Sequence, residues 1–370
     1  MRRAPKQFPC SDTVSQQQPP HRYFVNAYVD FLFIGGLSII AYFVIRNLGI
    51  QDRSYWVYTL SGGLVWIGNW PHFSATIYRL YRSRENVKQY PLTATLVPIV
   101  VFGGMIASFF SPNVVAPYFV KFFLIWSPYH FSGQTIGITL IYARRNGFVF
   151  NKLQRLALSG FVFGTFLTSS IAAEVSPEGN QYYSIHYPGF GLPYWLYQSS
   201  IYVIWASGIV LVGSIVLHCV KTRRFLHPMI LLPATAQYFW FVAGRSIPAF
   251  NEFVPFFHSI QYLLIAWSME IVERREQQKA AVNKAFFYKT SARWGLLNVA
   301  GGAGLFFLMP RFFAALGTPL DFSLGVVLAA IQIHHFFVDG VIWKLRRTSV
   351  SSPLMENVPS LYAKALQPAN

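Results

Sequence analysis

Cysteine and charged side chains are scarce in this sequence. Only Cys10 and Cys219 occur among 370 residues, which argues against both a disulfide framework and a zinc-thiolate site. Charged residues make up 12% of the chain, against roughly a quarter in water-soluble domains, whereas 54% of its residues are hydrophobic. Apolar runs of about 20 residues recur, and the short alternating segments of a transmembrane barrel are missing. The composition predicts an all-α, polytopic integral membrane protein.

Residues 1–23 are polar and contain no apolar core before a cleavage site, so we expect a cytoplasmic tail there rather than a secretory signal peptide. We expect residues 1–24 to form a disordered cytoplasmic tail, residues 25–347 a single transmembrane bundle, and residues 348–370 a second cytoplasmic tail. No glycine-rich phosphate loop and no stretch long enough for a separate soluble domain is present.

The apolar periodicity predicts about ten transmembrane helices. They are expected at 25–46, 55–78, 92–111, 117–143, 156–174, 195–219, 228–249, 253–272, 294–315 and 320–343. The net charge of +17 follows this alternation, since 25 of the 30 Lys and Arg residues fall in the six segments on one side. The positive-inside rule then places both termini in the cytoplasm, in a membrane of the cytoplasmic (inner) type. The same distribution argues against a nucleic-acid partner. The long outer connection, 175–194, is either a lid, an entrance or a plain connector.

Five of the nine histidines fall inside these apolar spans, and the spans that carry them all run in the same direction. Ionisable groups inside a membrane are costly, and they usually mark a functional site. The five are His72 in the second span, His130 in the fourth, His258 in the eighth, and His334 and His335 in the tenth.

Each span ends in a basic cluster, which gives a rough depth for each histidine. Counting back from the first cation places His72 and His335 about 10–14 Å from the boundary, and His130 and His258 about 21–24 Å from it, at about 1.5 Å per residue. Two such levels are compatible with one metal ion or with two.

Polar neighbours one helical turn away support metal binding, because a ligating imidazole usually donates its second N–H to a carboxylate or carbonyl. We predict His72, His130, His258 and His335 as metal ligands. His334 and Asp339 are expected to act as further ligands or as catalytic groups, and Arg245 is expected to hold a substrate head group. The residues expected to orient the imidazoles are Asn69, Gln134 and Gln261.

Imidazole with carboxylate favours non-haem iron that activates O₂, and the lack of Cys or Met clusters argues against a copper-thiolate site. The sequence therefore predicts a metal-dependent oxidoreductase or oxygenase. Its expected partners are a lipophilic substrate such as an isoprenoid, carotenoid or fatty chain, the membrane lipids, and an electron donor. The 18% aromatic content suits a long apolar ligand, although lipid-facing belts account for most of it.

This pattern of histidines on several apolar spans resembles that of the Brp/Blh membrane carotene dioxygenases, in which histidines from several helices hold iron. The resemblance implies an iron oxygenase with a lipophilic substrate. It covers only the general pattern, so it assigns no individual ligand. The HxxxH and HxxHH boxes of membrane di-iron desaturases are absent.

Other functions also fit parts of the sequence. The segment from His334 to Gly340 matches the HHxxxDG motif of soluble acyltransferase and condensation domains, whose fold cannot be built from membrane spans. A membrane-bound acyltransferase with His335 as general base is the main alternative, although it leaves the other intramembrane histidines unexplained. A haem with axial histidines, or a proton relay in a transporter, would use the same residues differently.

Overall fold

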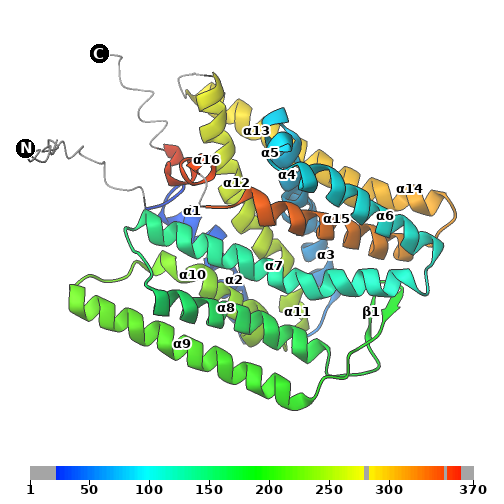
Figure 1. The fold of residues 1–370 in the computed structure, drawn as a ribbon, viewed down its shortest axis with the longest axis horizontal. Coiled ribbons are helices and arrows are strands. Elements are labelled where there is room, and N and C mark those ends of the chain that lie inside the picture. Colours follow the sequence, from blue (N-terminus) through cyan, green and yellow to red (C-terminus); the bar gives the residue numbers. More distant parts are fainter. Residues whose placement is uncertain (1–21, 279–282, 346–347, 360–370) are drawn as a thin grey trace, which may run out of the picture.

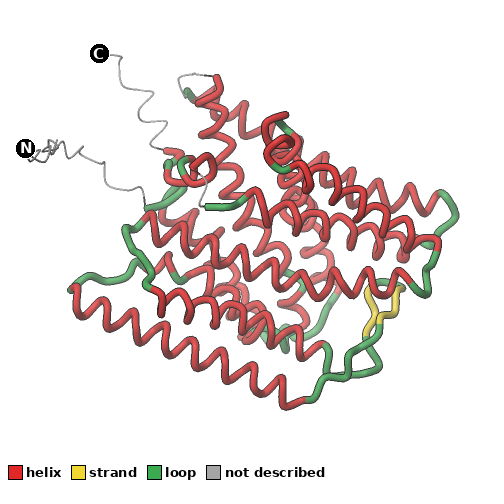
Figure 2. Tube along the Cα trace, viewed as in Figure 1, coloured by secondary structure: helices red, strands yellow, loops and turns green. Residues whose placement is uncertain are grey.

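The structure is a computed structural model that describes residues 22–278, 283–345 and 348–359. Within these ranges the chain is a helical bundle with one short β-hairpin at one end (Figures 1 and 2). The expected tail at 1–24 therefore lies almost entirely outside the described residues, as does the last part of the expected tail at 348–370.

The first half of the bundle contains several helices that continue through a π-helical turn (η). Its elements are α1 (Ala27–Phe31), η1 (Leu32–Gly36), α2 (Leu37–Asn47), α3 (Tyr55–Leu64), η2 (Val65–Asn69), α4 (Trp70–Tyr81), α5 (Arg84–Gln89), η3 (Leu92–Leu96), α6 (Val97–Phe110), α7 (Val115–Arg145) and α8 (Lys152–Ala173).

The second half begins with the hairpin and ends with short helices. Its elements are β1 (Asn180–Tyr182), β2 (Ile185–Tyr187), α9 (Tyr194–Thr222), the 3₁₀ turn η4 (Pro228–Ile230), α10 (Leu232–Tyr238), η5 (Phe239–Ala243), α11 (Pro248–Asn251), α12 (Val254–Gln278), α13 (Lys284–Ala303), η6 (Gly304–Leu308), α14 (Met309–Ala315), α15 (Leu320–Ile342), α16 (Thr348–Ser351) and the 3₁₀ turn η7 (Pro353–Met355).

Six helical stretches are long and apolar enough to cross a membrane, so the expected count of ten is not confirmed. They are Ala27–Asn47, Leu92–Phe110, Lys152–Ala173, Tyr194–Thr222, Lys284–Ala315 and Leu320–Ile342. Helices also form at the other four expected positions. Three of those four helical stretches are α3–α4, α7 and α12, which carry His72, His130 and His258 respectively. The helix at the fourth position, expected at 228–249, is interrupted after Ala243. Polar and charged residues lower the mean hydropathy of the three histidine helices.

Helix α15 occupies the centre of the bundle. About two thirds of its most apolar window, 67%, is buried, against at most 33% in the other five candidate spans. It packs against α4, α6 and α7, and Figure 1 shows it between α6 and α7, with α8 and α9 forming the far edge. Most residues of α15 are therefore enclosed by protein, and a buried polar group on this helix needs partners on neighbouring helices.

Buried ion pairs join α4 to α12 at the basic end of the bundle. The Arg82 guanidinium binds the carboxylates of Glu270 and Glu273, and Arg79 binds Glu273 at 3.2 Å. Burial alone would lower the pKa of Arg82, but these carboxylates raise its pKa above the usual value, so the guanidinium stays charged. The Arg79 guanidinium also lies 4.8 Å from the centre of the Trp343 ring, at the end of α15.

The segment after α15 returns to the bundle at the same end. Leu354 is fully buried, and Arg145 of α7 donates hydrogen bonds to the backbone carbonyls of Tyr23, Leu354 and Glu356. The described part of the expected C-terminal tail, 348–359, is thus packed against the helices.

The connection between α8 and α9 contains the hairpin and closes the opposite end of the bundle. Lys121 of α7 binds the Glu174 carboxylate at 2.8 Å and also donates to the backbone carbonyl of Pro188, and both members of the Lys121–Glu174 ion pair are nearly buried. The Ile185 side chain is 3% exposed and packs in the core between α7 and α15. These contacts fix the loop, expected at 175–194, over the end of the bundle.

Candidate metal centre

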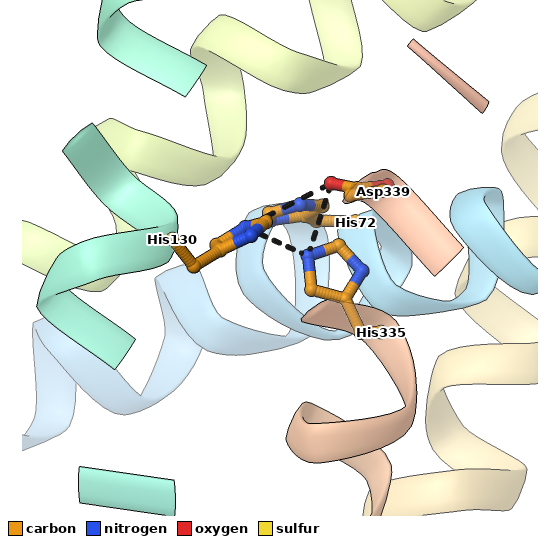
Figure 3. A group of neighbouring side chains, drawn as sticks. All are labelled: His72, His130, His335 and Asp339. Atoms are coloured by element: carbon orange, nitrogen blue, oxygen red, sulfur yellow. Dashed lines mark hydrogen bonds and ion pairs between the residues drawn. The ribbon is translucent and has the colours of Figure 1, made fainter. Parts of the chain in front are cut away.

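Three histidines and one aspartate from α4, α7 and α15 converge in the middle of the bundle. One possible ligand atom from each of His72, His130, His335 and Asp339 lies within 4.8 Å of all the others (Figure 3). His335 Nε2 is 3.1 Å from His130 Nε2 and 3.3 Å from Asp339 Oδ2, and His130 Nε2 is 3.7 Å from the same carboxylate oxygen. The four side chains belong to residues far apart in the sequence, except for the i, i+4 pair on α15.

Ser259 of α12 determines which nitrogen of His72 faces this group. Its hydroxyl donates to the Pro255 carbonyl at 2.7 Å, so its oxygen accepts the N–H of His72 Nδ1 at 3.0 Å. The Nε2 atom of the neutral ring therefore carries a lone pair, and this buried atom has no hydrogen-bond partner among the described residues. That is the tautomer a metal-ligating histidine requires.

The carboxylate of Asp339 is held through one oxygen, which leaves the other directed toward the imidazoles. Thr76 Oγ1 lies 3.1 Å from Asp339 Oδ1, and the indole nitrogen of Trp343 donates to the same oxygen at 3.2 Å. Thr76 Oγ1 is also 2.6 Å from the hydroxyl of Tyr262. This orienting shell comes from α4, α12 and the end of α15, so it fixes Asp339 from three directions.

The spacing of the ligand atoms fits a single ion. With bonds of about 2.1 Å, neighbouring ligands of a four-coordinate ion lie about 3.4 Å apart. The separations among His130, His335 and Asp339 are 3.1–3.7 Å, and His72 lies within 4.8 Å of all three. The two depth levels calculated from the sequence do not separate the histidines in the structure. That calculation assumed that the first cation of every span lies at one height, and the convergence of His72, His130 and His335 contradicts this assumption.

His258 lies beside the group and His334 lies away from it. The ring centre of His258 is 5.1 Å from that of His72 and 5.3 Å from that of His130, and neither of its nitrogens has a partner among the described residues. His334 is buried on another face of α15, with its ring 6.4 Å from that of Phe102 on α6. The four residues that converge thus include Asp339 and exclude both of these histidines.

The predicted orienting amides contact the site indirectly. Asn69 donates to the Ser259 hydroxyl at 3.3 Å, on the oxygen that also holds His72. Gln134 donates to the backbone carbonyl of His258 at 3.0 Å, and Gln261 bonds the Ile34 carbonyl.

Arg245, which was expected to bind a head group, is exposed at the hairpin end. Its guanidinium lies 5.4 Å from the Tyr197 ring centre, and it lines neither of the cavities described next.

Two cavities meet the group from opposite ends of the bundle, and both are lined by His130 and Phe336. An outer cavity of about 550 Å³ extends toward the hairpin, where Tyr182, Tyr183 and Glu252 form its wall. An inner cavity of about 300 Å³ extends along α7 and α15 toward Lys344 at the basic end. The group is therefore accessible from two directions, unlike a closed structural metal site.

Sequence reasoning missed Ser259, Thr76 and Trp343. A signal existed for two of them, since Thr76 is one turn from His72 and Trp343 is one turn from Asp339. Ser259 had none, because its contact with His72 joins two helices. Comparisons with protein-family models, curated proteins and solved structures found no match, so the site is interpreted from its geometry.

Proposed function

We propose that this protein is a membrane-embedded, metal-dependent oxidoreductase, with non-haem iron held by His72, His130, His335 and Asp339, that acts on a lipophilic substrate. The observation that carries the proposal is the convergence of three imidazoles and a carboxylate between two cavities inside an apolar helical bundle. The donor set supports it, because neutral imidazole with carboxylate suits iron that activates O₂, and no thiolate lies in the group.

The chain's own residues have distinct tasks in this proposal. Ser259 keeps the lone pair of His72 Nε2 directed at the group, while Thr76 and Trp343 keep one Asp339 oxygen away from it. Phe336 lines both cavities, and its ring centre is 4.7 Å from that of His130. Its ring positions an apolar substrate beside His130. Iron bound there would supply the one-electron and O₂ chemistry that these side chains lack.

The geometry favours an ion over the alternatives. His130 Nε2 and His335 Nε2 are 3.1 Å apart with Asp339 beside them, which leaves no room for a porphyrin ring between two axial histidines. An acyltransferase would use the His335–Asp339 pair as a base, but it gives no reason for the Nε2 atoms of His72 and His130 to face the same point.

The test is the metal content and optical spectrum of the detergent-purified protein, beside two variants of adjacent residues. His335→Ala removes a proposed ligand, and His334→Ala removes a histidine that is also buried on α15 but faces Phe102. We expect about one iron per chain without a Soret band in the wild type and in His334→Ala, and loss of the metal in His335→Ala.

Two results would overturn the proposal. One is folded protein that retains no metal after reconstitution with iron, manganese, zinc or copper. The other is equal metal loss in the two variants. If metal is absent and activity on acyl donors depends on His335 alone, the acyltransferase interpretation replaces it.

A further inference from the structure

The inner cavity is a groove between α7 and α15, with α12 as its floor. Its wall runs from His130 and Asp339 at the metal centre to Lys344 at the basic end. Tyr129 on one lip is 50% exposed, and Gly340 on the opposite helix is also exposed. The groove therefore opens sideways, toward the lipid that surrounds the bundle, as well as toward its basic end.

Three glycines give this groove its width. Gly133 and Gly137 lie one turn apart on α7, and Gly340 lies on α15, and all three line the cavity. A Cβ atom added at any of them would have no atom within 4 Å, so close packing of the two helices does not require glycine there. Because glycine has no side chain, these positions instead leave space beside the histidine–aspartate group that an unbranched chain can occupy.

Charge is confined to the two ends of the groove. Lys344 is the one cation in its wall, and among the described residues this ammonium group has no acidic partner. Asp339, at the other end, belongs to the proposed metal site. Between them the wall is glycine, aromatic and aliphatic apart from Gln134 and the hydroxyls of Tyr129 and Tyr262. An unpaired cation at the end of an apolar groove in a membrane protein favours a ligand with an anionic head and an apolar chain.

The position of Lys344 just beyond the end of α15 sets the length of that chain. Lys344 follows His335 by nine positions and lies two residues after the last residue of α15, so the two are separated by about 13 Å if the helical rise is carried to Lys344. An extended chain advances about 1.2 Å per bond, so a head group at Lys344 would place an atom roughly ten bonds away beside His130 and His335.

We propose that the groove between α7 and α15 binds a single-chain anionic amphiphile, with its head group at Lys344 and the middle of its chain at the histidine–aspartate group. The ligand enters sideways from the leaflet at the basic end, which the sequence predicts to be cytoplasmic. This inference rests on the proposed function only in taking the bound amphiphile to be the substrate of the metal site. Binding itself does not depend on the metal.

The probe is a long-chain fatty acid with a photoreactive diazirine, used on the purified full-length protein in detergent and mapped by mass spectrometry. With the diazirine about ten bonds from the carboxylate, crosslinks are expected around His130 and Phe336. With the diazirine next to the carboxylate, they are expected around Trp343 and Lys344. Crosslinks of both probes to the hairpin end of the outer cavity, at Tyr182, Tyr183 and Glu252, or spread over the lipid-facing side of α9, would overturn the proposal.

Three glycine variants test the route. Gly137→Leu should fill the groove and reduce the mid-chain crosslink at least fivefold. Gly62→Leu fills part of the outer cavity, and Gly213→Leu changes the exposed side of α9. Neither control variant should change the mid-chain crosslink. Since an added Cβ meets no atom within 4 Å at any of these positions, all three variants should fold. Equal effects in Gly137→Leu and Gly62→Leu would refute the assignment to this groove.

The head group is tested with Lys344→Gln and a neutral probe. Loss of a charge-assisted contact should weaken binding of the fatty acid about tenfold and leave binding of the matching long-chain alcohol unchanged. Competition by a diacyl phospholipid as strong as that by the fatty acid would show a site for a bilayer lipid and contradict the proposal.

Metal content, measured on every sample, separates the two claims. A wild-type chain that binds the probe but never binds metal refutes the proposed function alone, whereas a metal-loaded chain without groove crosslinks refutes this inference alone.

Discussion

Removing the hydroxyl that orients His72 should weaken metal binding without disturbing the bundle. In Ser259→Ala the Nδ1–H of His72 loses its acceptor, which lies 3.0 Å away in the structure. The neighbouring Tyr262 ring, 4.3 Å from that of His72, still restrains the plane of the imidazole. What is lost is the preference for the tautomer and ring orientation that present the Nε2 lone pair to the group.

The size of the effect follows from this limited loss. Changing a residue that orients a metal-ligating histidine costs about 10–100-fold in affinity, or about 1.4–2.8 kcal/mol. The net value of one hydrogen bond, about 1 kcal/mol, sets the lower limit, and the unpaired N–H left in a buried place adds to it. We therefore expect the dissociation constant for Fe(II) to rise by about 10–100-fold in Ser259→Ala.

The assay is titration of metal-free protein with Fe(II) against a competing chelator, under anaerobic conditions. Ser268→Ala is the matched control, because Ser268 is also buried on α12 and also donates to a carbonyl of its own helix, that of Ile265 at 2.8 Å. We expect the control to bind metal like the wild type. An unchanged affinity in Ser259→Ala, or an equal decrease in both variants, would refute the assigned role of the Ser259–His72 contact.

Four further changes test other parts of the structure. Asp339→Asn keeps the contacts of Thr76 and Trp343 with the side-chain oxygen but removes the negative charge. Metal affinity in the same titration should therefore fall more than tenfold, while the circular dichroism spectrum stays unchanged. Wild-type affinity would contradict the carboxylate's role. Arg82→Gln leaves Glu270 and Glu273 without their main partner and should lower the free energy of unfolding in detergent by about 3 kcal/mol. The control Arg84→Gln, at an exposed position, should have little effect. Equal decreases in unfolding free energy in the two variants would argue against a buried ion cluster. Lys121→Met leaves Glu174 without a cationic partner under the hairpin, so limited proteolysis within 175–193 should become faster than in the exposed-site control Lys152→Met. Equal cleavage would show that Lys121 does not hold the loop. Iron at 100 times its dissociation constant should stabilise the folded protein by about 2.7 kcal/mol, seen as a higher thermal midpoint that His335→Ala does not show.

Sequence patterns predicted helical segments well, but they did not identify membrane spans equally well. The helices α4, α7 and α12 form close to the expected positions, because apolar periodicity and helix-ending signals are local properties. Whether such a helix crosses a membrane depends on what surrounds it. A helix enclosed by other helices tolerates polar residues, and its mean hydropathy then falls below that of a lipid-facing span.

The convergence of the candidate site was predicted in part, for a similar reason. The i, i+4 spacing of His335 and Asp339 places both on one face of a helix, which the sequence shows directly. Which of the adjacent His334 and His335 faces the other histidines depends on how α15 is rotated against α4, α7 and α6. The same limit applies to His258, whose ring lies beside the group although its residue type and span match those of the other three.

The unpaired polar atoms of the interior suggest how the two cavities divide their roles. Of the 11 buried side-chain nitrogen and oxygen atoms without a partner in the described residues, four are imidazole nitrogens of His72, His258 and His335. A metal ion in the group would satisfy His72 Nε2, but both nitrogens of His258 and Nδ1 of His335 would need other partners, and both residues line the outer cavity. Buried polar atoms are normally satisfied by protein, water or ligand. The outer cavity thus has polar atoms for water or a small polar reactant, whereas the glycine-lined inner groove suits an apolar chain. Under the proposed function, the two reactants would approach the candidate metal site from opposite sides.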